Sequence, residues 1–358
     1  MKLKLFAFCI ALNLAFGDVL MIEKQGSFTI GGNIVEHNGT FSSENFIAPD
    51  GQKAYGDFAY VKFQIPQNAK KLPLIFQHGG AQSSRTWEST VDGRDGFDNI
   101  FVRKGYSVYL LDQPRSGKSN FSTKAITPDT PWVSNPMFGD KTLYILSRIG
   151  HFDDDKAVPN AQFPQGDDAY EKFQQSWTLG SGPLDNDLNA EVLAKLADKL
   201  GGAILVTHSM GGTIGWRSAI LTPNIKAIVA FEPGGTEFIF PENEMPNIKK
   251  AKFVPLSASA KGVSINEFKK LTQIPIVLYY GDYIKLGSDN VGEDKWGSEM
   301  DTAMQFVNTI NKHGGNATLV HLPTIGITGN SHFLMGEKNN QEIAELMAKW
   351  LEEKKLDK

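Results

Sequence analysis

Cysteine is almost absent from this sequence, which contains one among 358 residues. An intramolecular disulfide and a cysteine-based zinc cluster are therefore excluded, because each needs at least two thiols. A dominant charge of either sign is also missing, since 36 Lys and Arg residues stand against 40 Asp and Glu residues. Nucleic acids and anionic membranes bind proteins that have a basic field, so we expect neither as a partner.

Long apolar runs are equally scarce, and the one exception lies at the N-terminus. Residues 5–16 are apolar apart from one asparagine, follow two lysines and end before Gly17. This layout is typical of a secretory signal peptide, and the run is too short to span a bilayer as a permanent helix. We therefore expect residues 1–17 to be removed, a secreted or periplasmic location, and no membrane span in residues 18–358.

Short, continuous apolar runs dominate the rest of the chain, and such runs are typical of strands buried on both faces of a parallel sheet. The runs are 72–76, 107–111, 203–206, 227–231 and 274–280, with a less apolar candidate at 317–322. Helical patterns alternate with them at 97–104, 189–200, 211–220, 299–312 and 341–353. Two alternating segments, 26–30 and 57–65, come first and predict an antiparallel start. The order predicts an α/β fold, a mostly parallel central sheet with helices on both faces.

Residues 120–184 interrupt this alternation and are rich in Asp, Pro, Gly and aromatic residues. Loops of that length are usually functional lids or binding loops. We interpret the segment as a lid inserted into one catalytic domain, residues 18–358, with Trp132, Phe138 and Trp177 contacting the substrate. The alternative is a surface excursion that buries its aromatic side chains against the core.

Ser209 is the strongest candidate for a catalytic residue. It follows an apolar strand, precedes a helical pattern, and has Thr207 and Gly211 two positions away on either side. A sharp strand-to-helix turn exposes a nucleophilic hydroxyl, and small neighbours fit its tight geometry. The usual pattern is G-x-S-x-G, in which Thr207 here replaces the first glycine. The alternative is an ordinary serine at a helix N-terminus.

A histidine-glycine loop follows the strand at 72–76, and its backbone can point N–H groups toward the nucleophile. We expect the backbone N–H groups of Gly80 and Met210 to form an oxyanion hole. His78 is expected to brace this loop, and His208 to point away from the nucleophile in a structural role.

His332 is the candidate base, because it lies late in a glycine-rich loop directly before the final helix. Glu232 and Asp282 each end a predicted strand, and either carboxylate could orient the imidazole. Either could equally cap a helix. The pattern alone favours Asp282, without closing the choice.

Taken together, these motifs resemble the α/β-hydrolase family, and most closely the secreted bacterial esterases of the esterase 713 type. The segments that carry the resemblance are 78–79, 87–96, 105–114, 207–212 and 326–332, within a likeness that runs from about 25 to 352. In that group the triad acid follows the strand after the nucleophile helix, which implies Glu232 rather than Asp282.

The resemblance implies a serine esterase that forms an acyl-enzyme on Ser209, acts on a small-molecule ester and needs no cofactor or metal. An acyltransferase or amidase with the same triad remains an alternative, as does a non-catalytic binding protein on the same fold. The sequence also leaves a homodimer open.

Overall fold

The computed structural model describes residues 19–119, 122–123, 139–151, 156–178, 180–235, 237–253 and 258–358. The predicted signal peptide lies outside the described residues. Among the helices of the described part, none combines the length and the hydropathy needed to cross a bilayer.

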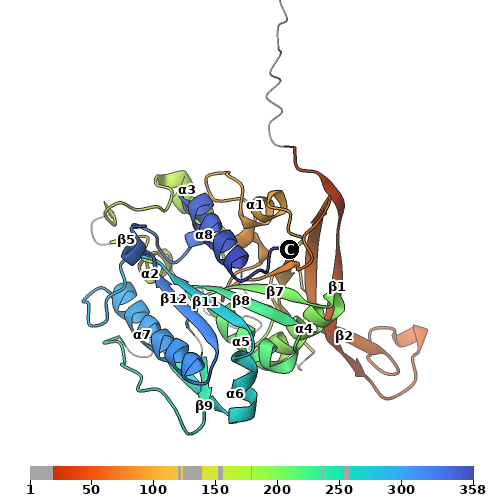
Figure 1. Ribbon diagram of the computed structural model, residues 1–358. Helices are drawn as coiled ribbons and strands as arrows, with labels where there is room; N and C mark the ends of the chain where they lie inside the picture. Colours follow the sequence, from red (N-terminus) through yellow and green to blue (C-terminus); the bar gives the residue numbers. More distant parts are fainter. Residues whose placement is uncertain are drawn as a thin grey trace, which may run out of the picture.

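Eight strands form the central sheet, in the order β1-β2-β4-β3-β7-β8-β11-β12 (Figure 1). They are β1 (Ile22–Glu36), β2 (Lys53–Pro66), β3 (Leu74–Gln77), β4 (Val108–Asp112), β7 (Ala203–His208), β8 (Ile225–Phe231), β11 (Pro275–Tyr280) and β12 (Asn316–His321). Strand β2 runs antiparallel to both of its neighbours, and all the later pairs are parallel. The predicted fold class, with its antiparallel start, is confirmed.

Helices cover both faces of this sheet. They are α1 (Phe97–Arg103), α2 (Asp140–Leu146), α3 (Asp167–Gln174), α4 (Asn186–Leu200), α5 (Gly211–Leu221), α6 (Ile265–Leu271), α7 (Val291–Lys312) and α8 (Asn340–Glu353). Shorter elements are β5 (Gly150–His151), β6 (Lys156–Ala157), β9 (Glu237–Pro241), β10 (Ser259–Val263), and the 3-10 turns η1 (Ser43–Asn45), η2 (Ser84–Trp87), η4 (Leu322–Ile325) and η5 (Leu334–Gly336).

The core consists of two apolar layers, one on each side of the sheet. In β7, Leu205 belongs to the layer that includes residues of α4, α5, α6 and α7, whereas Ile204 and Val206 belong to the layer that includes residues of α1 and α8. Successive side chains of a strand point to opposite faces, so a strand that is covered twice must be apolar throughout. The continuous apolar runs in the sequence have this origin.

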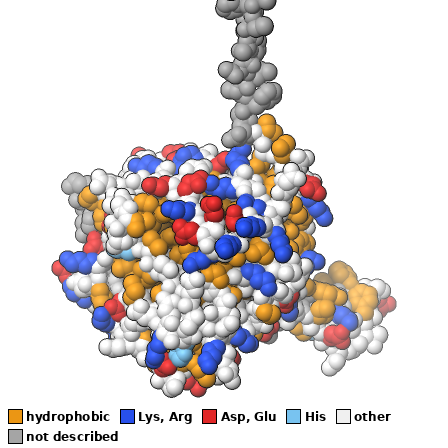
Figure 2. Space-filling model, viewed as in Figure 1, with side chains coloured by type: hydrophobic (Ala, Val, Ile, Leu, Met, Phe, Trp, Pro, Cys, Tyr) orange, Lys and Arg blue, Asp and Glu red, His pale blue; other side chains and the backbone are white. Residues whose placement is uncertain are grey.

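Strands β1 and β2 are longer than predicted, at 15 and 14 residues. The sequence suggested that the first strand ends before Gly31 and Gly32, but both glycines adopt positive φ inside the strand. A Cβ atom at Gly32 would lie 2.3 Å from the Phe58 ring, so this ring occupies the space that the glycine leaves. Figure 1 shows that the pair extends beyond the sheet as an arm, and Figure 2 shows apolar side chains on it.

The segment predicted as a lid is partly described and contains α2, α3 and the β5–β6 pair. Trp132 and Phe138 lie outside the described residues. The lid interpretation and the domain boundaries therefore stay predictions, and Trp177 is the one aromatic residue of that set whose place is known.

Leu205 tests the two-layer core, because it is fully buried in the central strand β7. We expect Leu205→Ala to lower the free energy of unfolding by roughly 2–5 kcal/mol, through lost burial and the cavity that is left. The matched control is Leu221→Ala, since Leu221 is 55% exposed at the end of α5. Urea unfolding followed by circular dichroism measures both, and equal small losses would contradict this packing.

Candidate active site

Ser209 lies at the turn between β7 and α5, and its φ of 53° is in the left-handed region. The turn is crowded: a Cβ at Gly79 would lie 2.9 Å from Ser209 Cβ, and one at Gly211 would lie 2.8 Å from the His78 carbonyl oxygen. Thr207 is tolerated where the usual pattern has glycine because α5 approaches it through Gly215, whose added Cβ would lie 3.1 Å from Thr207 Cγ2. The sequence-predicted elbow geometry is present.

Gly80 and Met210, the predicted oxyanion-hole residues, lie next to each other. A Cβ at Gly80 would lie 2.2 Å from Met210 Sδ, and both residues line the cavity that Ser209 also lines. Their role as donors stays a prediction. His78 binds within the same loop, with Nδ1 2.7 Å from the Gly79 carbonyl oxygen and Nε2 accepting from the Gln113 N–H at 3.4 Å.

The predicted base and one of the predicted acids form a direct hydrogen bond. His332 Nδ1 lies 2.7 Å from Glu232 Oε2, although the residues are 100 positions apart in sequence. Glu232 is fully buried, and its other oxygen accepts from Arg148 Nη2 at 2.5 Å and from the Gly281 N–H at 2.7 Å. A buried carboxylate that binds a guanidinium, an amide and an imidazole is fixed in place and holds the ring in one orientation.

Glu232 also sits close to the nucleophile turn through the backbone. The Ser209 N–H donates to the Phe231 carbonyl at 3.0 Å, and the Gly234 N–H donates back to the Ser209 carbonyl at 3.2 Å. Glu232 has a φ of 43°, so both of these turns use the left-handed region. The two strand ends that carry Ser209 and Glu232 are thus joined directly.

Asp282, the alternative acid, is engaged elsewhere. Its carboxylate accepts from the backbone N–H groups of Gly329 at 2.9 Å and Tyr283 at 2.7 Å, and its own N–H donates to the Asn330 carbonyl at 2.7 Å. These bonds fasten the glycine-rich loop that carries His332 to the end of β11. The geometry therefore favours Glu232 as the partner of the imidazole.

Aromatic rings enclose the imidazole of His332. Its centroid lies 4.1 Å from that of Trp296 and 4.4 Å from that of His208. His208 places Nε2 2.9 Å from the His332 carbonyl oxygen and Nδ1 3.3 Å from Gln82 Oε1, so its ring supports the histidine loop. Burial lowers the pKa of His332 well below its usual value, and the charges of Arg148 and Lys295 lower this pKa further. The ring is therefore neutral at neutral pH, as a proton acceptor must be.

A cavity of about 260 Å³ opens over these residues. Trp177 lines it, together with Leu143 and Leu146 from α2 and with Phe333. Contact of Trp177 with the substrate stays a prediction. A cavity of this size with an apolar wall and a few polar groups is typical of a small-molecule site.

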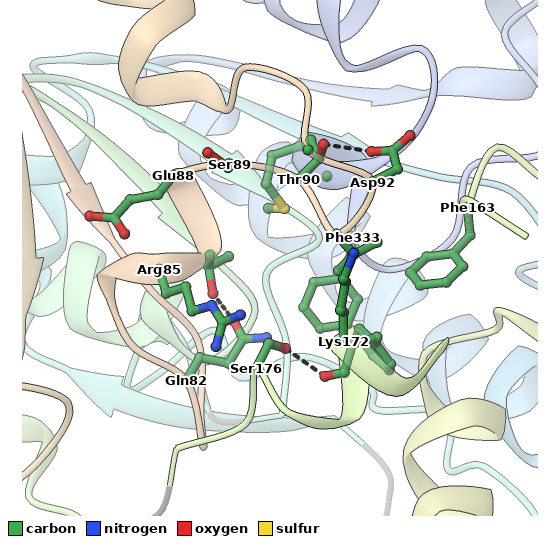
Figure 3. Close-up of a pocket in the computed structure, with 16 residues that line it drawn as sticks. Gln82, Arg85, Glu88, Ser89, Thr90, Asp92, Phe163, Lys172, Ser176 and Phe333 are labelled. Atoms are coloured by element: carbon green, nitrogen blue, oxygen red, sulfur yellow. Dashed lines mark hydrogen bonds between the residues drawn. The ribbon is translucent and has the colours of Figure 1, made fainter. Parts of the chain in front are cut away.

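Figure 3 shows a second cavity, of about 340 Å³, which shares the lining residues Gln82 and Phe333 with the first. Several of its polar side chains already have partners: Thr90 donates to Asp92 at 2.6 Å, and Ser176 donates to the Phe173 carbonyl at 2.7 Å. None of its described lining residues is a histidine. The smaller cavity is therefore the candidate active site.

The chain is similar to several known proteins. The profile of the Alpha/beta hydrolase family matches residues 74–356. The chain belongs to this family. A probable secreted lipase, phiG, from a fungal species (strain ATCC 74256) is 27% identical in an alignment of 338 positions that covers 82% of this chain and 85% of that protein.

The solved structure of a novel bacterial esterase is 28% identical and superposes with a TM-score of 0.73, covering 94% of this chain and 97% of the esterase. The predicted resemblance to the α/β-hydrolase family, close to bacterial esterases, is confirmed. Both relatives support the predicted enzyme class, a carboxylic ester hydrolase.

Sequence reasoning missed three residues around His332. Arg148 belongs to the segment predicted as a lid, and nothing in the sequence pairs it with Glu232. Lys295 and Trp296 lie in the first turns of α7, which was predicted to start at 299 and starts at 291. The available signal was Asn290, a residue type that often caps helices. Its Oδ1 accepts from the N–H groups of Gly292 and Glu293.

In the part of the chain that is described, no group of three or more His, Cys, Asp or Glu side chains is placed so that it could hold a metal ion.

The pH dependence of turnover tests the environment of His332. Protonation of the ring removes the base, so kcat/KM falls at acid pH, and a lowered pKa moves this fall to more acidic pH. We expect the acid limb of kcat/KM for a neutral ester to be centred below pH 6.5, the reference value for the ring. Samples incubated at each pH and assayed after return to neutral pH control for unfolding. An acid limb centred above about pH 7 would contradict the described surroundings.

Proposed function

We propose that this protein is a secreted serine hydrolase that cleaves carboxylic esters through an acyl-enzyme on Ser209. The observation that carries the proposal is the 2.7 Å hydrogen bond between His332 and Glu232 at the cavity that Ser209 lines. Family membership and the two relatives support ester hydrolysis as the reaction. The N-terminal pattern and the relative named a probable secreted lipase support secretion.

Each residue has one part in the proposed reaction. Glu232 holds Nδ1 of His332 and thereby leaves Nε2 as the nitrogen that takes the proton of Ser209. The serine oxygen attacks the ester carbonyl, and the N–H groups of Gly80 and Met210 stabilise the resulting oxyanion. His332 then donates its proton to the departing alcohol, and a water molecule deprotonated by the same ring releases the acid.

The positive charge that forms on His332 during attack needs a stabilising partner in this buried place. Glu232 supplies it at hydrogen-bond distance, and Arg148 and the Gly281 N–H hold that carboxylate in place. The groups that stabilise the imidazolium are therefore in place before the reaction starts. Such preorganised electrostatic stabilisation is usually the largest single contribution to catalysis.

Covalent labelling tests the nucleophile. We expect a fluorophosphonate probe to modify Ser209 in the wild-type protein, and Ser209→Ala to abolish labelling and to lower hydrolysis of a p-nitrophenyl ester roughly 10³-fold or more. Peptide mass spectrometry locates the adduct, and circular dichroism checks that the variant is folded. A folded wild-type protein that stays unlabelled would favour a non-catalytic binding protein.

A pair of isosteric substitutions tests the acid. Glu232→Gln should lower kcat strongly, because an amide cannot stabilise the imidazolium; neutralising the acid costs on the order of 10⁴ in a serine protease. Asp282→Asn is the matched control, and we expect a far smaller loss, since Asp282 binds backbone N–H groups of the histidine loop. Both variants are compared in kcat on one ester at one pH, and the reverse ranking would assign the role to Asp282.

A further inference from the structure

Lys295 is a buried cation in the wall of the candidate active site. It lies in the second turn of α7, its side chain is 10% exposed, and it lines the cavity together with Ser209 and His332. Removing an ammonium group from water is costly unless other groups compensate. The proposed ester hydrolysis gives this charge no task.

The surroundings compensate the charge only in part. Lys295 Nζ lies 3.2 Å from Glu299 Oε1 and 3.3 Å from the centroid of the Trp296 ring. An ammonium has three N–H donors, and within the described part of the chain Glu299 is its only hydrogen-bonding or ion-pairing partner. The same Glu299 oxygen also accepts from the Gly235 N–H at 2.9 Å. Donor capacity on Lys295 is therefore left over for a ligand.

Among the described residues that line the cavity, the basic side chains have no acidic counterpart. Arg115 and Lys295 are the lysine and arginine residues of this lining, and none of the described lining residues is an aspartate or a glutamate. Arg115 is already paired, with Nε 2.7 Å from Asp57 Oδ1 and Nη1 2.7 Å from the Pro183 carbonyl oxygen. Glu299, which balances Lys295, does not line the cavity. The cavity thus presents one cation with spare donors and no opposing carboxylate.

Lys295 is also close to the reacting groups. The Trp296 ring contacts its ammonium and, at 4.1 Å between centroids, the imidazole of His332. Gly235, which shares the Glu299 oxygen, would place an added Cβ 3.2 Å from Met210 Cγ. A substrate group that reaches Lys295 therefore lies near the scissile carbonyl.

We propose that Lys295 determines specificity by binding a carboxylate of the substrate, so that the preferred esters carry a negative charge close to the ester bond. This inference rests on the proposed function, because it names the class of ester that the same site takes. Charge-assisted hydrogen bonds to a carboxylate are strong where water is largely excluded. The apolar side chains Leu143, Leu146 and Trp177 would pack against the carbon chain between the two polar ends.

Paired substrates that differ in one charge test the proposal. Mono-p-nitrophenyl glutarate and p-nitrophenyl valerate have similar length, and only the first has a free carboxylate. We expect wild-type kcat/KM to be higher for the glutarate ester, and Lys295→Met to lower the ratio of the two kcat/KM values roughly tenfold or more, as expected for the loss of a charged hydrogen bond. Lys295→Arg keeps the charge and should keep the sign of the preference.

The control is Lys312→Met, which removes an equal charge from the exposed end of the same helix and should leave the ratio unchanged. A wild-type protein that hydrolyses both esters equally would overturn the inference while leaving the proposed function in place, as would an equal loss on both esters in Lys295→Met. If Lys295→Met does not fold, the wild-type ratio still decides. Failure to hydrolyse either ester, together with an unlabelled Ser209, would instead reject the proposed function.

Discussion

The buried carboxylate of Glu232 is the constraint on which the rest of the site depends. An ionised carboxylate without contact to water is stable only when every lone pair has a good donor. Its donors come from three distant places: Arg148 after α2, Gly281 after β11, and His332 in the loop before α8. Satisfying one charge therefore fixes the relative positions of a helix end, a strand end and the catalytic loop.

The sequence predicted the sheet well because burial on both faces leaves a clear signal. Runs such as 203–206 and 227–231 are apolar throughout. Ser209 lies three positions after the first run and Glu232 one position after the second, so both lie at the carboxyl edge of neighbouring parallel strands. The elbow, the histidine-glycine loop and the late histidine could be placed for the same reason. Their roles in catalysis remain proposals, although their proximity is a matter of topology.

The residues that support the imidazole could not be predicted from local patterns. Arg148 binds a carboxylate 84 positions away, and hydrophobic periodicity along the sequence does not reveal a contact between such distant residues. The start of α7 was missed because Gly292 and Gly297 weaken the helical pattern. Packing between helices explains the glycine at position 292. A Cβ at Gly292 would lie 2.1 Å from the Ile145 carbonyl oxygen, so glycine lets α7 approach α2 closely. The helix that brings Trp296 and Lys295 to the site thus looks locally unfavourable.

The left-handed backbone at Ser209 sets the protein's stability against its chemistry. A residue with a side chain is destabilised by about 1–2 kcal/mol in that conformation, a cost that glycine avoids. Selection for thermal stability alone would therefore reward glycine at Ser209, whereas at Glu232, which is also left-handed, the unpaired guanidinium of Arg148 would oppose it. Laboratory evolution for heat resistance would have to be coupled to turnover at every round, because the most stable descendants of this chain are not the ones that react.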